Sequence, residues 1–160
     1  MANEENALSP LPVGWREWVV LPELGIGALQ AKVDTGARTS CLHAFQLDPF
    51  EECGARRVRF AIHPVQGSDE LVRECVAEVV DEREVTDSGG HTESRLVIRT
   101  PIIVGGRTWP IEMTLTNRDT MRFRMLLGRT ALREGGLIVD PNGAFLAGGP
   151  FGSPDEEEEE

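Results

Sequence analysis

Short runs of alternating apolar and polar residues, separated by turn signals, make up much of this chain of 160 residues. In residues 57–62, Val58, Phe60 and Ile62 fall on one face of an extended segment, and residues 108–116 repeat the pattern. A period of two is typical of a strand with one buried face. Many short strands, frequent turns and one helical run predict an all-β, barrel-like domain.

The other elements are predicted from apolar runs bounded by turn residues. Residues 71–80 are ambiguous, because their apolar positions also fit one face of a helix. Their β-branched valines favour extended structure, and we expect mostly strand there. A single short helix is expected between Gly128 and Gly135. Further strands are predicted at residues 15–21, 28–33, 40–45, 77–85, 95–104 and 137–140.

A folded domain of residues 13–147 is predicted between two polar ends. Residues 1–12 are expected to form a flexible leader, and residues 148–160 a disordered acidic tail. Residues 137–140 and 144–146 are expected to close the fold as a final hairpin around Pro141-Asn142-Gly143.

The net charge of −11 is concentrated at the end of the chain, where residues 155–160 are all acidic. Without these six acids, 16 basic residues face 21 acidic ones, a balance that argues against nucleic acid as a partner. The sequence contains no apolar run long enough to span a membrane, and its first residues lack the regions of a signal peptide. We therefore expect a cytoplasmic protein.

The cysteines and histidines show no metal-binding spacing. Cys41, Cys53 and Cys75 are irregularly placed, as are the three histidines, and no His-Glu-x-x-His motif is present. Cys41-x-His43 alone is too little for a structural zinc site, which needs four ligands. We expect reduced thiols, no metal and no cofactor.

The strand ending at Val33 runs into Asp34-Thr35-Gly36, an order of residues that suits peptide hydrolysis by paired carboxylates. Asp34 would hold the attacking water, Thr35 would stiffen the loop, and Gly36 would turn the backbone so that its N–H reaches the carboxylate. For the tripeptide alone, an ordinary turn with a solvated aspartate is the alternative interpretation. Asp87-Ser88-Gly89 spells a variant of the same triad, but its polar flanks favour a hairpin turn.

Asp34-Thr35-Gly36-Ala37 together with Leu126-Leu127-Gly128-Arg129 resembles the retropepsin-like aspartic proteases. Over residues 13–147 the chain is similar to the bacterial family labelled "putative ATP-dependent zinc protease", which is linked to RimK-type ATP-grasp glutamate ligases. The motifs that carry this closer similarity are Lys32-Val33, Thr39-Ser40, Leu42-His43-Ala44, Thr114-Leu115-Thr116-Asn117-Arg118 and the two above.

The resemblance implies a retropepsin-like closed barrel lobe with one short C-terminal helix. It also implies an aspartic endopeptidase that works as a homodimer, because one chain offers one Asp loop. The long hairpin around residues 86–93 would be a flap over a peptide or protein substrate, for which glutamate-rich chains are the candidates. The expected substrate-binding residues are Ala37, Arg38, Ser88, Gly89, Gly90, Arg118 and Arg129.

The chain departs from the pattern of the viral relatives at one position, and two other functions are kept as alternatives. The acid that usually follows Asp-Thr-Gly-Ala in viral relatives is Arg38 here, so Arg129 needs another partner, for which Asp140 is the candidate. The alternative function is a non-catalytic adaptor, which would bind acidic peptides or an ATP-grasp ligase as its partner. A zinc-dependent hydrolase is a third, and it would require bound metal.

Overall fold

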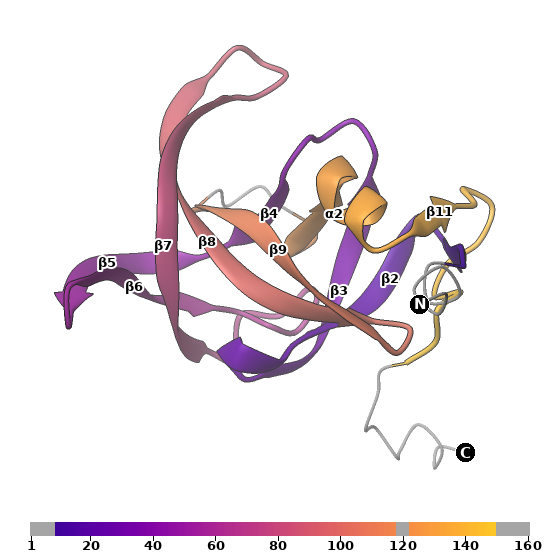
Figure 1. The fold of residues 1–160 in the computed structure, drawn as a ribbon, viewed down its shortest axis with the longest axis horizontal. Helices are drawn as coiled ribbons and strands as arrows, with labels where there is room; N and C mark the ends of the chain where they lie inside the picture. Colours follow the sequence, from indigo (N-terminus) through magenta and orange to yellow (C-terminus); the bar gives the residue numbers. More distant parts are fainter. Residues whose placement is uncertain (1–8, 118–121, 150–160) are drawn as a thin grey trace, which may run out of the picture.

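A computed structural model describes residues 9–117 and 122–149 (Figure 1). The expected leader up to residue 8, the tail from residue 150 and Arg118 lie outside the described residues. The elements are β1 (Leu11–Val13), β2 (Arg16–Leu21), the 3-10 turn η1 (Pro22–Leu24), β3 (Ile26–Asp34), β4 (Ser40–His43), β5 (Phe45–Glu52), β6 (Ala55–Ile62), β7 (Arg73–Thr86), β8 (Thr92–Val104), β9 (Arg107–Thr116), β10 (Met125–Gly128), α2 (Arg129–Glu134) and β11 (Leu137–Val139).

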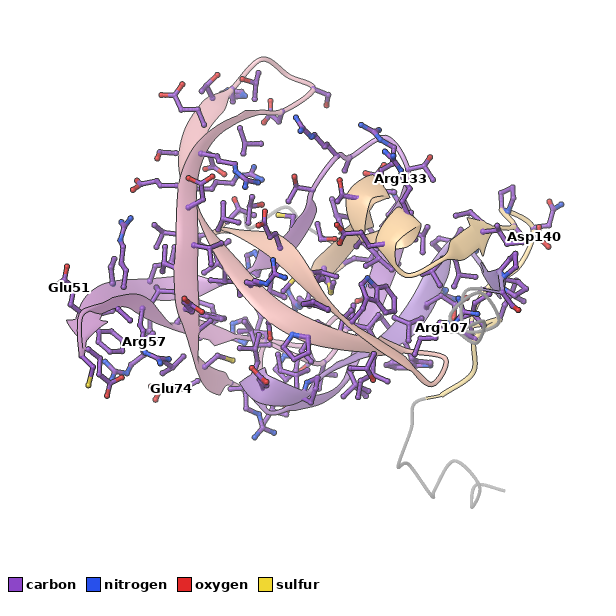
Figure 2. All side chains as sticks on the ribbon, in the orientation of Figure 1. Glu51, Arg57, Glu74, Arg107, Arg133 and Asp140 are labelled. Atoms are coloured by element: carbon purple, nitrogen blue, oxygen red, sulfur yellow. The ribbon has the colours of Figure 1, made fainter. Side chains whose placement is uncertain are left out.

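The main sheet curls into a barrel with a three-stranded extension. Its strand order is β2-β3-β10-β4-β9-β8-β7-β6-β5, and a further pairing of Val20 with Ile103 joins β2 to β8 and closes the barrel. Strands β7, β6 and β5 continue the sheet outward, where charged side chains such as Glu51 and Glu74 are exposed (Figures 1 and 2). In residues 9–117 and 122–149, the predicted all-β barrel with one short helix is confirmed.

The barrel interior is filled by the apolar face that the alternation predicts. Phe60, Ile98, Met113 and Leu127 are fully buried, with Leu29 from β3 against them in one core cluster. Burying a side chain of this size stabilises a fold by about 1.5–3 kcal/mol. In the region described, no helix is long and apolar enough to cross a membrane.

The ambiguous residues 71–80 fall largely in the long strand β7. Cys75, Ala77 and Val79 are buried while the residues between them are exposed, so the preference for strand is confirmed. The helical periodicity misleads because Leu71, Val72, Val76 and Val80 are exposed rather than on a buried face.

The predicted final hairpin is wrong. Residues 137–139 form β11, which pairs in parallel with β1, whereas residues 144–146 form no strand. Leu11 and Pro12, expected in the leader, therefore belong to the folded domain. This pairing joins segments that are more than 120 positions apart in the sequence, so no local turn signal could indicate it.

A buried carboxylate holds the segment that the hairpin was expected to occupy. Glu17 is fully buried, and its Oε2 accepts hydrogen bonds from the N–H groups of Gly14 at 2.6 Å and Leu146 at 2.7 Å. Its Oε1 accepts from the N–H of Ala147 at 3.1 Å. Bonds from backbone amides to a carboxylate are strong, so Glu17 replaces strand pairing as the anchor of this segment.

The Cys75 thiol is predicted to be unreactive in the native protein. Burial raises its pKa to about 11, whereas Cys53 is an exposed free cysteine. Because the thiolate is the nucleophile, we expect iodoacetamide at pH 8 to label Cys75 about a hundredfold or more slowly than Cys53. Mass spectrometry of the labelled peptides measures both rates, and urea-unfolded protein is the control, in which they should converge. Equal rates in the native protein would contradict the burial of Cys75.

Candidate active site

Asp34 is the last residue of β3, and the chain turns sharply behind it. Its Oδ1 accepts a hydrogen bond from the Gly36 N–H at 3.0 Å, and its carbonyl accepts one from the Ala37 N–H at 3.2 Å. Asp34 is half-buried, while Thr35 and Gly36 are exposed. The carboxylate is therefore fixed by its own loop but remains open to a ligand.

Residues 128–130 hold the Asp34 loop in place through contacts with its backbone. β10 runs parallel to β3 and places Gly128 beside Asp34. The N–H groups of Arg129 and Thr130 then donate to the carbonyls of Ala37 at 2.7 Å and Arg38 at 3.1 Å. The two motifs that are nearly 90 residues apart in the sequence thus form one rigid unit.

The Arg129 side chain does not take the role expected for it. Its Nη1 donates to the Thr35 carbonyl at 2.9 Å, whereas the expected partner Asp140 accepts from the Asn142 N–H in its own turn. Arg129 therefore supports the Asp loop from its exposed side instead of pairing with an acid.

Gly128 is required by a close approach of backbone. A Cβ at this position would lie 2.7 Å from the Thr39 carbonyl carbon and 2.9 Å from both the Ala37 oxygen and the Ser40 nitrogen. We expect Gly128→Ala to lower the free energy of unfolding by about 1–3 kcal/mol, because backbone atoms cannot rotate away.

Gly27→Ala is the matched control for Gly128→Ala, since Gly27 lies on neighbouring strand β3 and a Cβ there meets no atom within 4 Å. Urea unfolding of both variants compares them. Equal stability of the two would mean that the loop does not pack on Gly128.

A cleft of about 1320 Å³ opens in front of Asp34. The Asp loop lines one side of it, and the long β7–β8 hairpin, which rises beyond the barrel in Figure 1, lines another. Of the residues predicted from the sequence, Asp34, Gly36, Ala37, Arg38 and Ser88 line the cleft. Thr35, Gly89, Gly90 and Arg129 are not among its lining residues.

The tip of the hairpin is a tight turn built on Asp87. The Asp87 Oδ1 accepts from the N–H groups of Gly89 and His91, both at 2.9 Å, and Gly90 adopts a positive φ of 88°. Asp87-Ser88-Gly89 therefore serves the turn, as the polar flanks of this tripeptide predict.

Sequence reasoning missed the arginines and acids that the barrel strands bring into the cleft. Arg83 donates to Asp81 at 2.7 Å and to Glu112 at 2.9 Å, and its hydrogen bond lowers the pKa of Asp81. Arg95 and Arg99 line the same cleft from β8. Their four-residue spacing puts them on one face of a strand, the signal that could have identified them as a pair.

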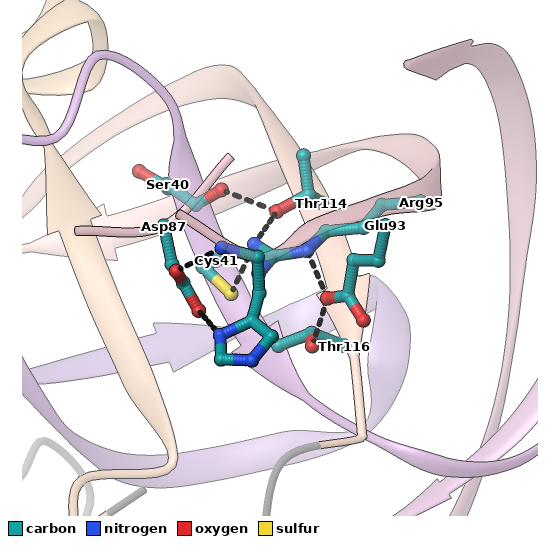
Figure 3. A network of polar contacts seen from close by, with 8 residues as sticks. Ser40, Cys41, Asp87, Glu93, Arg95, Thr114 and Thr116 are labelled. Atoms are coloured by element: carbon teal, nitrogen blue, oxygen red, sulfur yellow. Dashed lines mark hydrogen bonds and ion pairs between the residues drawn. The ribbon is translucent and has the colours of Figure 1, made fainter. Parts of the chain in front are cut away.

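Arg95 is the centre of a buried polar network (Figure 3). It is 8% exposed, and its Nε donates to the Glu93 carboxylate. The same carboxylate accepts from the Thr116 hydroxyl at 2.7 Å. This network ties the base of the hairpin to β9. Neither this network nor any other place in the described part of the chain gathers three histidine, cysteine or acidic side chains that could hold a metal ion.

Comparison with known proteins identifies the family. A relative from Shewanella pealeana named "Probable alpha-L-glutamate ligase" is 46% identical over 136 residues, which are 85% of this chain and 30% of the relative. One of the same name from Parasynechococcus marenigrum is 47% identical over 136 residues, again 85% of this chain, and 29% of the relative. The chain thus spans less than a third of the length of these relatives.

The fold is also that of a solved protein of unknown function, Lpg0085 from Legionella pneumophila. The TM-score is 0.74 at 27% identity, over 87% of this chain and 99% of that one. The family profile described as "Retropepsin-like aspartic endopeptidase RimB" matches residues 12–150. That description names an aspartic endopeptidase and gives no support to the zinc-protease wording. The chain belongs to the RimB-like family of retropepsin-like domains.

Proposed function

We propose that this protein is an aspartic endopeptidase that works as a homodimer, with one Asp34 from each chain. The observation that carries the proposal is the Asp34 carboxylate, fixed by the Gly36 N–H and open to a cleft of about 1320 Å³. The β7–β8 hairpin, of which residues 83–88 line the cleft, would act as a flap that excludes water from a bound peptide.

Two chains are needed because the reaction uses two acids. One carboxylate takes a proton from water while a protonated partner donates a hydrogen bond to the scissile carbonyl. Asp87, the other acid in an Asp-x-Gly tripeptide, is held by its turn. A two-fold axis beside the exposed Thr35 and Gly36 would bring both copies of Asp34 together.

The chemistry then requires no covalent intermediate. Two carboxylates about 3 Å apart share one proton. The water between them adds to the peptide carbonyl. Its proton passes to the ionised Asp34, and the protonated Asp34 gives its proton to the carbonyl oxygen, so that a tetrahedral diol forms. The diol collapses when the protonated Asp34 gives its proton to the amide nitrogen and the C–N bond breaks. One diol hydroxyl then gives its proton to an ionised aspartate as the new carboxyl group forms, which restores the shared proton.

Glutamate-rich or glutamylated proteins are the proposed substrates, and a RimK-type ATP-grasp ligase is the proposed partner. Arginine side chains line the cleft on several sides, and their forked donors suit carboxylates. The relatives named as glutamate ligases, of which this domain matches under a third, support the association. They also favour the second candidate function, a non-catalytic module that presents acidic peptides to such a ligase.

The proposal is tested by incubating the wild-type protein with a glutamate-tailed peptide and, separately, with the same peptide without the tail. Mass spectrometry should find new termini within the tail, and light scattering should give twice the chain mass as concentration rises. Binding of the tailed peptide without any cleavage would contradict the peptidase and favour the non-catalytic module of a ligase. Cleavage by a protein that stays monomeric with bound peptide would contradict the shared pair of aspartates.

A further inference from the structure

Four arginines line the cleft, and they differ in what surrounds them. Arg83 forms ion pairs with two acids, Asp81 and Glu112, at 2.7 and 2.9 Å, whereas Arg95 forms one among the described residues, with Glu93. Arg38 and Arg99 are exposed at the rim, where water screens their charge. Arg95 alone among these four is buried, with 8% of its surface exposed. A charge withdrawn from water discriminates between ligands more strongly than one at the rim.

The network around Arg95 engages Nε and Nη1 of its guanidinium and leaves Nη2 without a partner among the described residues. Nε is taken by Glu93, and Nη1 lies 3.5 Å from the Thr114 hydroxyl and 3.6 Å from the Cys41 thiol, both long contacts (Figure 3). Nη2 makes no hydrogen bond to any residue that the structure describes. The side chain is thus held in place while part of its donor capacity is unused.

Nη2 does not belong to the fully buried polar atoms that lack a partner among the described residues. It is therefore accessible, and a molecule in the cleft can reach it. Because Arg95 lines the cleft, a ligand in the cleft is the partner that the geometry allows. A carboxylate oxygen is a strong acceptor for such a guanidinium N–H, because both groups are charged.

We propose that Arg95 is the specificity-determining residue of the cleft, and that its Nη2 group donates to the carboxylate of an acidic side chain of the bound peptide. The inference rests on the proposed function, because it assigns the side chain that reads the substrate of the same site. Glu93 and Thr116 position the guanidinium, and Arg38 and Arg99 contribute only long-range attraction.

The test measures binding in the Asp34→Asn background, so that it does not depend on cleavage. The probes are a glutamine hexapeptide and its variants with one glutamate at successive positions, at about 0.15 M salt, where rim charges are screened. At one position we expect glutamate to bind about 10- to 100-fold more tightly than glutamine. Arg95→Met should abolish that preference, and Arg95→Lys, which keeps the charge but not the fork, should reduce it to a few-fold.

Arg99→Gln is the matched control, because it removes a charge from the same cleft at an exposed position, and it should keep the preference. A structural role for Arg95 would lower both affinities equally and leave their ratio unchanged, which would overturn the proposal. If both Arg95 variants unfold, NMR of the Asp34→Asn protein tests the proposal through the Nε–H resonance of Arg95. It should shift with the glutamate peptide and not with the glutamine peptide, and no shift with either overturns the proposal. A preference without wild-type cleavage would refute only the peptidase activity.

Discussion

Asp34→Asn is expected to reduce peptide cleavage by about a thousandfold or more and to leave the melting temperature within a degree or two of wild type. An asparagine keeps the Oδ1 that accepts the Gly36 N–H at 3.0 Å, so the loop should hold its shape. The amide cannot take the proton that a carboxylate removes from water. Initial rates on a glutamate-rich peptide, beside thermal unfolding of the same samples, measure the two effects.

Asp140→Asn is the matched control for this substitution. The Asp140 Oδ1 accepts from the Asn142 N–H at 3.0 Å, the same contact two residues ahead that Asp34 makes. Asp140 lies in the turn after β11 and is not among the residues that line the cleft (Figure 2). The Asp140→Asn protein should therefore cleave the peptide at the wild-type rate. If Asp34→Asn were as active as Asp140→Asn, Asp34 would not be catalytic.

Glu17→Ala is expected to lower the free energy of unfolding by about 3–5 kcal/mol. The substitution leaves three backbone N–H groups, of Gly14, Leu146 and Ala147, without the carboxylate that now accepts from them. The Gly14 bond is buried and the other two are part-buried, and an orphaned donor costs about 1–3 kcal/mol where it is buried. Denaturant unfolding measures the loss, and proteolysis should begin in the released segment 143–147.

Glu23→Ala provides the comparison for Glu17→Ala. Glu23 is exposed in the 3-10 turn η1, and removing such a carboxylate should change stability by less than about 0.5 kcal/mol. A Glu17→Ala protein as stable as Glu23→Ala would show that residues 146–147 are held by something other than this carboxylate.

The sequence predicts the elements whose signals are local. Alternation identifies β6 and β9, glycines delimit α2, and turn residues identify the hairpin tip at Asp87. The β1–β11 pairing and the Glu17 anchor are missed because each joins residues more than 120 positions apart, and neither leaves a mark in a short window.

The candidate site divides in the same way. Asp34, Gly36 and Gly128 are predicted because each is part of a motif with its own mechanism. Arg83 and Glu112 are missed because they meet only when β7 and β9 flank β8 in the sheet. Arg129 is recognised but its partner is wrong, since the sequence does not reveal that the Thr35 carbonyl lies within reach.

The central claim is that each active site takes one Asp34 from each of two chains. Wild-type and Asp34→Asn proteins, unfolded and refolded together at constant total concentration, test it most directly through the cleavage rate at each mixing ratio. Random pairing predicts a rate that follows the square of the wild-type fraction, so an equal mixture keeps about a quarter of the activity. An equal mixture that keeps about half would contradict the claim, because it would mean that each chain works with its own Asp34 alone.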